Sequence, residues 1–183
     1  MNNIKKQLRK PRNMSFIPAD AYYVSISDIP LSLLESWHIE VLFIDRDNTC
    51  VPRSTRTIPA DVSAWFDALA AHTSIRAYIV SNNIHTEAVN KTAQSLGIKA
   101  ISHAMKPSCS VMVNVMKKHG IAPEHACVIG DQLFTDILAG KRGGTRTILV
   151  KPQSRRDLWY TYVLRVIEWI VLRRVTWMGA HHE

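Results

Sequence analysis

The sequence predicts an α/β domain with a Rossmann-like, parallel five-stranded sheet and flanking helices. From residue 41 onward, short apolar runs alternate with segments whose apolar residues recur at helical spacing, which is typical of such a fold. Acidic, hydroxyl and lysine side chains follow several of these runs, at the edge where parallel sheets bind their ligands. At 183 residues, the chain is long enough for one domain with a hydrophobic core.

Proline and glycine residues help to place the expected elements. The five strands are expected at residues 41–45, 75–81, 99–102, 126–131 and 145–150. The helices are expected at residues 59–71, 86–96, 107–119 and 133–139. Two of these helices have a proline in the first turn, and Gly97 and Gly120 directly follow two helix ends.

The positive charge of the chain is confined to its ends. The formal net charge is +8, yet residues 13–150 contain equal numbers of acidic and basic side chains. This distribution predicts a basic N-terminal arm at 1–14, a neutral domain at 15–151 and a basic segment at 152–183. A neutral domain with basic ends argues against a nucleic-acid partner and favours contact of the ends with an anionic membrane surface.

Cysteine content and hydropathy favour a cytoplasmic protein. The three cysteines are too few and too scattered for a disulfide framework or a zinc ribbon. No apolar segment follows the basic N-terminus, as a secretory signal would require. The most apolar run, residues 158–172, is interrupted by Arg165 and Glu168 and falls short of the about 20 residues that cross a bilayer.

The C-terminal segment has the pattern of an amphipathic helix. If residues 157–178 are helical, their polar side chains form one narrow stripe, and the apolar remainder carries Trp159, Trp169 and Trp177. Basic flanks with aromatic residues on an apolar face favour a peripheral position on the inner face of the membrane. The alternative is a helix that packs on its own domain or on a second subunit.

Polar residues from four segments are expected to meet at the carboxyl edge of the sheet. Asp45 and Asp47 are separated by one residue, so their side chains point the same way in an extended chain. Asp131, from another strand end, can bring a third carboxylate. Three clustered carboxylates need a cation, and an all-oxygen set suits Mg²⁺. Lys106 and Ser81 are suited to bind an anion. A phosphate bound to the metal therefore accounts for both the three carboxylates and these two anion-binding residues.

These residues predict phosphoryl transfer to a carboxylate. Asp45 would attack phosphorus and form an aspartyl phosphate, while Mg²⁺ and Lys106 neutralise the phosphate oxygens. Asp47 would protonate the leaving alkoxide and then deprotonate the attacking water. The Ser81 hydroxyl and the backbone N–H of Asn82 would bind the phosphate. The Thr49 hydroxyl would complete this phosphate-binding set by holding the turn through a hydrogen bond.

Four motifs resemble, in order and spacing, those of haloacid dehalogenase (HAD) superfamily phosphatases of subclass IIIA. They are DRDNT at 45–49, VSNN at 80–83, KP at 106–107 and GDQLFTD at 130–136. The last three, with TILV at 147–150 and YYVSISDIP upstream, more narrowly resemble the phosphatidylglycerophosphate phosphatase subfamily.

The resemblance implies a Mg²⁺-dependent phosphomonoesterase with Asp45 as nucleophile and Asp47 as acid/base. It also implies that Asp45, Asp131 and the backbone carbonyl of Asp47 hold the metal. Asp136 matches the second acid of the last motif, and we give it a supporting role. The implied reaction converts phosphatidylglycerophosphate to phosphatidylglycerol.

Arg46 is the one departure from the lipid-phosphate pattern, in which DLDNT is usual. The DRD sequence resembles soluble heptose-bisphosphate and histidinol-phosphate phosphatases, although the cysteine–histidine zinc loop of many such enzymes has no counterpart here. Because side chains alternate along an extended chain, we expect Arg46 to face away from the two aspartates. The gaps 50–81 and 81–106 leave no room for a substantial cap domain, so an open site is expected.

Two other functions remain open at this stage. One is a soluble phosphatase that acts on a sugar phosphate or another metabolite. The other is a catalytically idle module that binds a membrane or nucleic acid through its basic ends. The complete set of acidic residues and Lys106 argues against the idle module, and the missing cap argues for a lipid over a metabolite.

Overall fold

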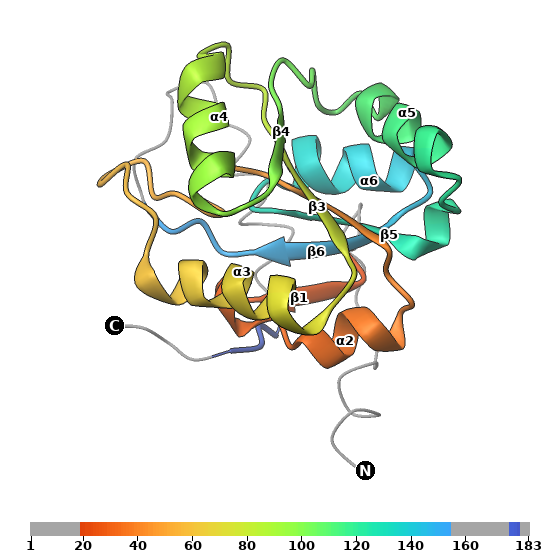
Figure 1. The fold of residues 1–183 in the computed structure, drawn as a ribbon, viewed down its shortest axis with the longest axis horizontal. Coiled ribbons are helices and arrows are strands. Elements are labelled where there is room, and N and C mark those ends of the chain that lie inside the picture. Colours follow the sequence, from red (N-terminus) through yellow and green to blue (C-terminus); the bar gives the residue numbers. More distant parts are fainter. Residues whose placement is uncertain (1–18, 155–175, 180–183) are drawn as a thin grey trace.

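The computed structural model describes residues 19–154 and 176–179, and its centre is a six-stranded parallel sheet (Figure 1). In sheet order the strands are β1 (Ala21–Tyr23), β6 (Arg146–Val150), β5 (Ala126–Gly130), β2 (Val41–Ile44), β3 (Arg76–Val80) and β4 (Lys99–Ile101). The α-helices are α2 (Leu31–Ser36), α3 (Ala60–His72), α4 (Thr86–Ser95), α5 (Ser110–His119) and α6 (Leu138–Arg142). The predicted parallel α/β fold is confirmed.

The predicted number of strands is wrong by one, because β1 was not expected. This strand has only three residues and pairs with β6 in parallel, Tyr22 opposite Leu149. Ser25 follows it closely and caps a 3₁₀ turn, Ile26–Asp28. An apolar run this short, ended by a turn, carries no periodicity from which a strand could be recognised.

The sheet is buried on both faces, which explains why its central strand is a continuous apolar run. Leu42 and Ile44 of β2 pack in a cluster with side chains of α3 and α4. Val41 and Phe43 point the other way and pack with side chains of α5 and α6. The two core layers fix β2 between β5 and β3, and therefore fix the position of the residue that follows Ile44.

Two expected helices begin later than the sequence indicates. Helix α5 starts at Ser110, not at residue 107. Residues 105–108 form a separate turn, in which the Ser108 N–H donates to the Met105 carbonyl at 2.9 Å, and the Ser108 hydroxyl accepts from the Ser110 N–H. The expected helix 133–139 is divided. A π-helical turn, Leu133–Ile137, comes first, and α6 follows it.

The end of the expected C-terminal helix is also different. Met178 pairs with β1: its N–H donates to the Tyr22 carbonyl at 3.0 Å, and its carbonyl accepts from the Val24 N–H at 2.7 Å. The Trp177 ring meets the Tyr22 ring edge-on, with centroids 5.9 Å apart. Residues 176–178 are therefore not helical, and Met178 covers the outer edge of β1. The rest of the predicted helix, from 157 to 175, and the N-terminal arm at 1–14 lie outside the described residues.

Within residues 19–154 and 176–179, no helix has the length and apolar character needed to cross a membrane. In the same part of the chain, the connections that follow β2 and β3 contain only loops, α3, α4 and β4. The expectation of no substantial cap domain is confirmed.

Candidate active site

The carboxyl ends of the central strands bring the predicted site residues together. Asp45 directly follows β2, and its N–H extends the ladder to β5 by bonding the Ile129 carbonyl at 2.8 Å. Ser81 follows β3 and Asp131 follows β5. Lys106 comes from the loop between β4 and α5. As predicted, one edge of the parallel sheet collects these side chains.

Lys106 forms the centre of the site. Its ammonium Nζ lies 2.5 Å from Asp45 Oδ1 and 2.7 Å from Asp136 Oδ1. The side chains of Lys106, Asp45 and Asp136 are only 4%, 11% and 2% exposed, respectively. Charges this well shielded from water interact strongly, and each needs a partner.

The pKa values reflect this balance of burial and charge. Burial alone lowers the pKa of Lys106, but the Asp136 and Asp45 carboxylates raise it above its ordinary value, so the lysine stays charged. Burial raises the pKa of Asp45 to about 7, helped by the charges of Asp136 and Asp47 and opposed by Lys106.

Three carboxylates lie close enough to share a cation. One oxygen each from Asp45, Asp131 and Asp136 lies within 4.8 Å of the other two. Asp131 and Asp136 are both 2% exposed. A compact set of carboxylate oxygens is the donor chemistry that hard divalent cations such as Mg²⁺ prefer. Asp136, expected only as a supporting residue, thus belongs to both the acidic cluster and the lysine bridge.

The π-helical turn explains how Asp136 reaches the site. The N–H of Ile137 bonds the carbonyl of Gln132, five residues back, in addition to the usual bond from the Asp136 N–H. Asp136 Oδ2 also accepts from the Gln132 N–H at 3.1 Å. A side chain on Gly130 would not fit, since its Cβ would lie 2.4 Å from Asp136 atoms. The glycine therefore permits the close approach of Asp136 to the strand end.

Asn82 supports the lysine through its side chain. Its Nδ2 donates to the Lys106 carbonyl at 2.9 Å, and its Oδ1 accepts from the Lys106 N–H at 2.7 Å. The sequence predicts a role only for the backbone N–H of Asn82, so this side-chain role is an addition. Ser81 is buried beside it, and its Oγ accepts from the Asn83 N–H at 3.1 Å.

Asn48, not Thr49, holds the loop that follows Asp47. Asn48 has a φ of 63°, and its Oδ1 accepts from the Arg53 N–H at 3.2 Å and from Ser154 Oγ at 2.6 Å. The hydroxyl of Thr49 is buried and has no hydrogen-bond partner among the described residues. The expected turn-holding bond from Thr49 is therefore wrong. An asparagine tolerates positive φ and bonds nearby backbone, which is the signal that identifies it.

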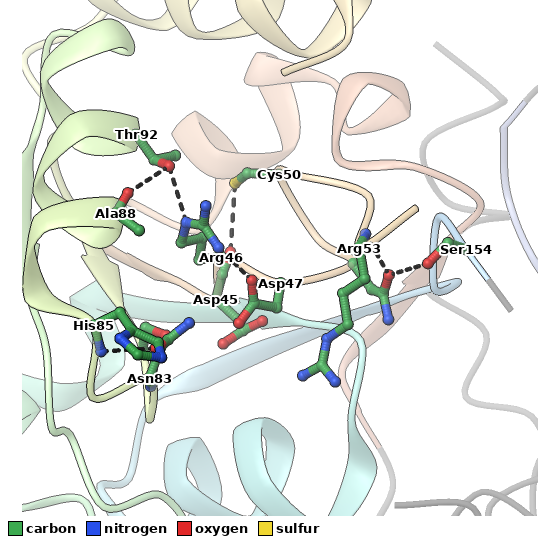
Figure 2. Close-up of polar contacts among 12 residues, drawn as sticks. Asp45, Arg46, Asp47, Cys50, Arg53, Asn83, His85, Ala88, Thr92 and Ser154 are labelled. Atoms are coloured by element: carbon green, nitrogen blue, oxygen red, sulfur yellow. Dashed lines mark hydrogen bonds and ion pairs between the residues drawn. The ribbon is translucent and has the colours of Figure 1, made fainter. Parts of the chain in front are cut away.

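Residues 153 and 154 lie against the same loop. The Gln153 N–H donates to the Asn48 carbonyl at 3.0 Å, and Gln153 Nε2 donates to the Thr49 carbonyl at 2.9 Å. Figure 2 shows Ser154 reaching toward this loop from the end of the domain. These contacts join segments about a hundred positions apart, so no local sequence pattern could have indicated them.

Arg46 does not face away from Asp47, contrary to the prediction from strand alternation. Strand β2 ends at Ile44, and the chain then turns, with the N–H groups of Cys50 and Val51 both bonded to the Arg46 carbonyl at 3.0 Å. In this turn, the Arg46 guanidinium forms an ion pair with Asp47 Oδ1 (Figure 2).

The sequence matches a known family over most of its length. A family model described as mitochondrial PGP phosphatase matches residues 1–153. The chain belongs to this phosphatase family. It is also 33% identical over 153 residues to the probable phosphatase YqeG of Bacillus subtilis, covering 84% of this chain and 87% of that protein.

Other relatives of this phosphatase match shorter segments or the fold alone. A phosphatidylglycerophosphate phosphatase 1 of Arabidopsis thaliana is 34% identical over 62 residues, which are 34% of this chain and 18% of that protein. Among solved structures, a HAD-like family hydrolase from Porphyromonas gingivalis has a TM-score of 0.52 at 12% identity, covering 71% of this chain and 98% of that chain. This solved structure shows that the chain has a HAD-like fold. Its membership of the phosphatase family makes it a phosphoric monoester hydrolase.

Several polar residues of this phosphatase near the motifs shape loops. Asn83 Oδ1 accepts from the His85 N–H at 2.8 Å, and the Gln132 carbonyl accepts from the Asp136 N–H at 3.0 Å. Cys50 is buried; burial raises the pKa of its thiol well above the ordinary value, and its Sγ donates to the Asp45 carbonyl at 3.4 Å.

Proposed function

We propose that this phosphatase is Mg²⁺-dependent, acts through an aspartyl phosphate and converts phosphatidylglycerophosphate to phosphatidylglycerol. The observation that carries the chemistry is the bridge from Lys106 to Asp45 and Asp136 beside Asp131. This arrangement brings a nucleophile, a fixed positive charge and an all-oxygen cation site together at one edge of the sheet.

The side chains divide the reaction between them. Asp45 attacks phosphorus, and the Lys106 ammonium neutralises charge on the phosphate oxygens. Asp47 protonates the leaving alkoxide and then removes a proton from the water that hydrolyses the aspartyl phosphate. Asp136 holds Lys106 in place. Further phosphate contacts are assigned to the Ser81 hydroxyl and the backbone N–H of Asn82.

Mg²⁺ would neutralise charge on the phosphate as a Lewis acid when bound. The residues proposed to hold it are Asp45, Asp131 and the backbone carbonyl of Asp47. Asp136 contributes negative charge to the same position, since its carboxylate lies within the acidic cluster.

A lipid substrate is supported by the family model and by the architecture around the site. The matched family carries the name of a PGP phosphatase. Only loops, α3, β3, α4 and β4 separate Asp45 from Lys106 in sequence, and no inserted domain occurs in this described stretch. A substrate held at a surface fits an uncapped site better than a small metabolite that needs enclosure. We place the enzyme peripherally on the cytoplasmic face of a membrane, held by its basic ends.

The substrate assignment is tested by comparing phosphate release from phosphatidylglycerophosphate in phosphatidylglycerol vesicles with release from soluble esters, with and without Mg²⁺. We expect Mg²⁺-dependent release that is fastest from the lipid, and co-sedimentation of the enzyme with these vesicles. Asp45→Asn protein serves as the blank. Equal or faster turnover of a soluble sugar phosphate would overturn the lipid assignment, and an enzyme that stays in the supernatant would overturn the membrane placement.

Mg²⁺ should also raise the melting temperature of the protein without substrate. A ligand at about 100 times its Kd stabilises a protein by about 2.7 kcal/mol. For a domain of this size that corresponds to an increase of roughly 5–10 °C. Asp131→Asn should lose most of this increase, measured by thermal unfolding, because the cluster loses a charged ligand.

The matched control is Asp67→Asn, which removes an exposed carboxylate from α3. It should keep the full Mg²⁺ effect. A melting temperature that Mg²⁺ leaves unchanged in the wild type, or raises equally in Asp131→Asn, would contradict the proposed metal site.

A further inference from the structure

Arg46 is held at two points, one on each side of its guanidinium. On one side, Nε donates to Thr92 Oγ1 of α4 at 2.9 Å, and on the other Nη1 pairs with Asp47 Oδ1. Figure 2 shows the guanidinium between the α4 hydroxyl and the carboxylate. The side chains of Arg46 and Asp47 are 12% and 19% exposed, so the ion pair is only partly screened by water.

The anchor on α4 is itself fixed. Thr92 is 6% exposed, and its hydroxyl donates to the Ala88 carbonyl, one helical turn back, at 3.0 Å. Because the hydroxyl proton is used in this bond, an oxygen lone pair is left to accept from Arg46 Nε. The planar, permanently charged guanidinium can serve two partners at once in a defined geometry, which a lysine ammonium cannot do as rigidly.

Only one oxygen of the Asp47 carboxylate takes part in this contact. Oδ1 is bound by Arg46, so rotation of the carboxylate is restricted and Oδ2 is left for another partner. Proton transfer requires the acid or base to lie within hydrogen-bond reach of the reacting oxygen in a defined direction. The contact therefore acts on the group that the proposed mechanism uses as acid and base.

We propose that Arg46, anchored on Thr92 of α4, is a positioning residue that orients the Asp47 carboxylate for proton transfer to the leaving group. This inference rests on the proposed role of Asp47. In this arrangement, Arg46 uses Nε to bind Thr92 and Nη1 to bind Asp47. Helix α4 thereby contributes to catalysis from outside the four sequence motifs.

The test compares two leaving groups. An alkyl phosphate, either glycerol 3-phosphate or the lipid substrate, has a poor leaving group that needs a proton, whereas p-nitrophenyl phosphate does not. The rate compared is kcat/KM, because it reports the steps through release of the leaving group and not the later hydrolysis of the aspartyl phosphate, which is common to both esters. Arg46→Gln should lower kcat/KM for the alkyl ester by about 10- to 100-fold, less than the about 10²- to 10⁴-fold that general acid catalysis contributes in full. The kcat/KM for the nitrophenyl ester should fall far less.

Two further pairs of variants separate positioning from general damage to the fold. Thr92→Val removes the anchor and should reproduce the selective loss in weaker form, while Thr92→Ser, which keeps a hydroxyl, should behave as the wild type. Arg53→Gln removes a positive charge from the same loop without touching Asp47, so the ratio of the two rates should stay at the wild-type value. A structural role alone would lower both rates equally.

Asp47→Asn is measured in the same series to separate the two hypotheses. If Asp47→Asn loses alkyl ester turnover selectively but Arg46→Gln keeps the wild-type ratio of rates, the positioning role is wrong and the proposed function stands. If Asp47→Asn itself keeps the wild-type rates, the proposed acid/base role fails, and the inference fails with it.

Discussion

Asp45→Asn should lower kcat by about 10⁴-fold or more, because an amide cannot form the aspartyl phosphate. Among the described residues of the site, no second carboxylate occupies the place of Asp45. Asp45 stands at the end of a central strand, fixed by its N–H bond to Ile129 and by its ion pair with Lys106. Asp131 and Asp136 approach from a different strand and turn, and Asp136 is already engaged by Lys106.

The variant should remain folded, which makes the loss of activity interpretable. Lys106 keeps Asp136 as its partner, so no buried charge is left alone. Steady-state phosphate release measures the loss. Borohydride reduction of the wild-type enzyme during turnover, followed by mass spectrometry, should convert residue 45 to homoserine through the acyl phosphate. Appreciable turnover by folded Asp45→Asn protein would rule out the covalent mechanism.

Lys106→Met should lower both activity and the free energy of unfolding. Methionine fills a similar volume, but the two buried carboxylates of Asp45 and Asp136 lose the cation between them. Removing one partner of a buried ion pair costs about 3–5 kcal/mol. Chemical denaturation in EDTA measures the loss of stability free of bound metal.

Two comparisons test whether the loss comes from uncompensated charge. Lys141→Met breaks an ion pair with Asp20 whose side chains are 33% and 21% exposed, and should cost less than about 1 kcal/mol. In the double variant Lys106→Met and Asp136→Asn, a neutral amide replaces one of the two buried carboxylates. The double variant should therefore be more stable than Lys106→Met alone. A double variant no more stable than Lys106→Met alone would refute the electrostatic explanation.

The sequence was sufficient to predict the parallel α/β fold and the edge at which the site lies. The buried strand Val41–Ile44 is followed directly by Asp45, and parallel strands place their carboxyl ends at the same edge of the sheet. The sequence alone therefore places Asp45, Ser81, Lys106 and Asp131 at one edge of the sheet. This placement depends only on strand direction, which the alternation of strands and helices determines.

The features that were missed depend on geometry that strand and helix periods do not describe. Arg46 was assigned to the wrong face because the alternation rule stops at Ile44, where β2 ends. Asp136 reaches the acidic cluster through a π-helical turn. Strand β1 has three residues and is recognisable only through its pairing with β6. In each case a local departure from regular structure decides which side chains meet.

The contacts of Gln153 and Ser154 with the loop at Asn48 and Thr49 have a consequence for orientation. The C-terminal segment leaves the described domain at a point bonded to the loop that carries Asp47. A lipid or protein surface that bound the chain directly after Ser154 would therefore lie near the loop that carries Asp47. A chain that left the domain at the opposite end of the strands would anchor the enzyme equally well, but with its catalytic edge turned away.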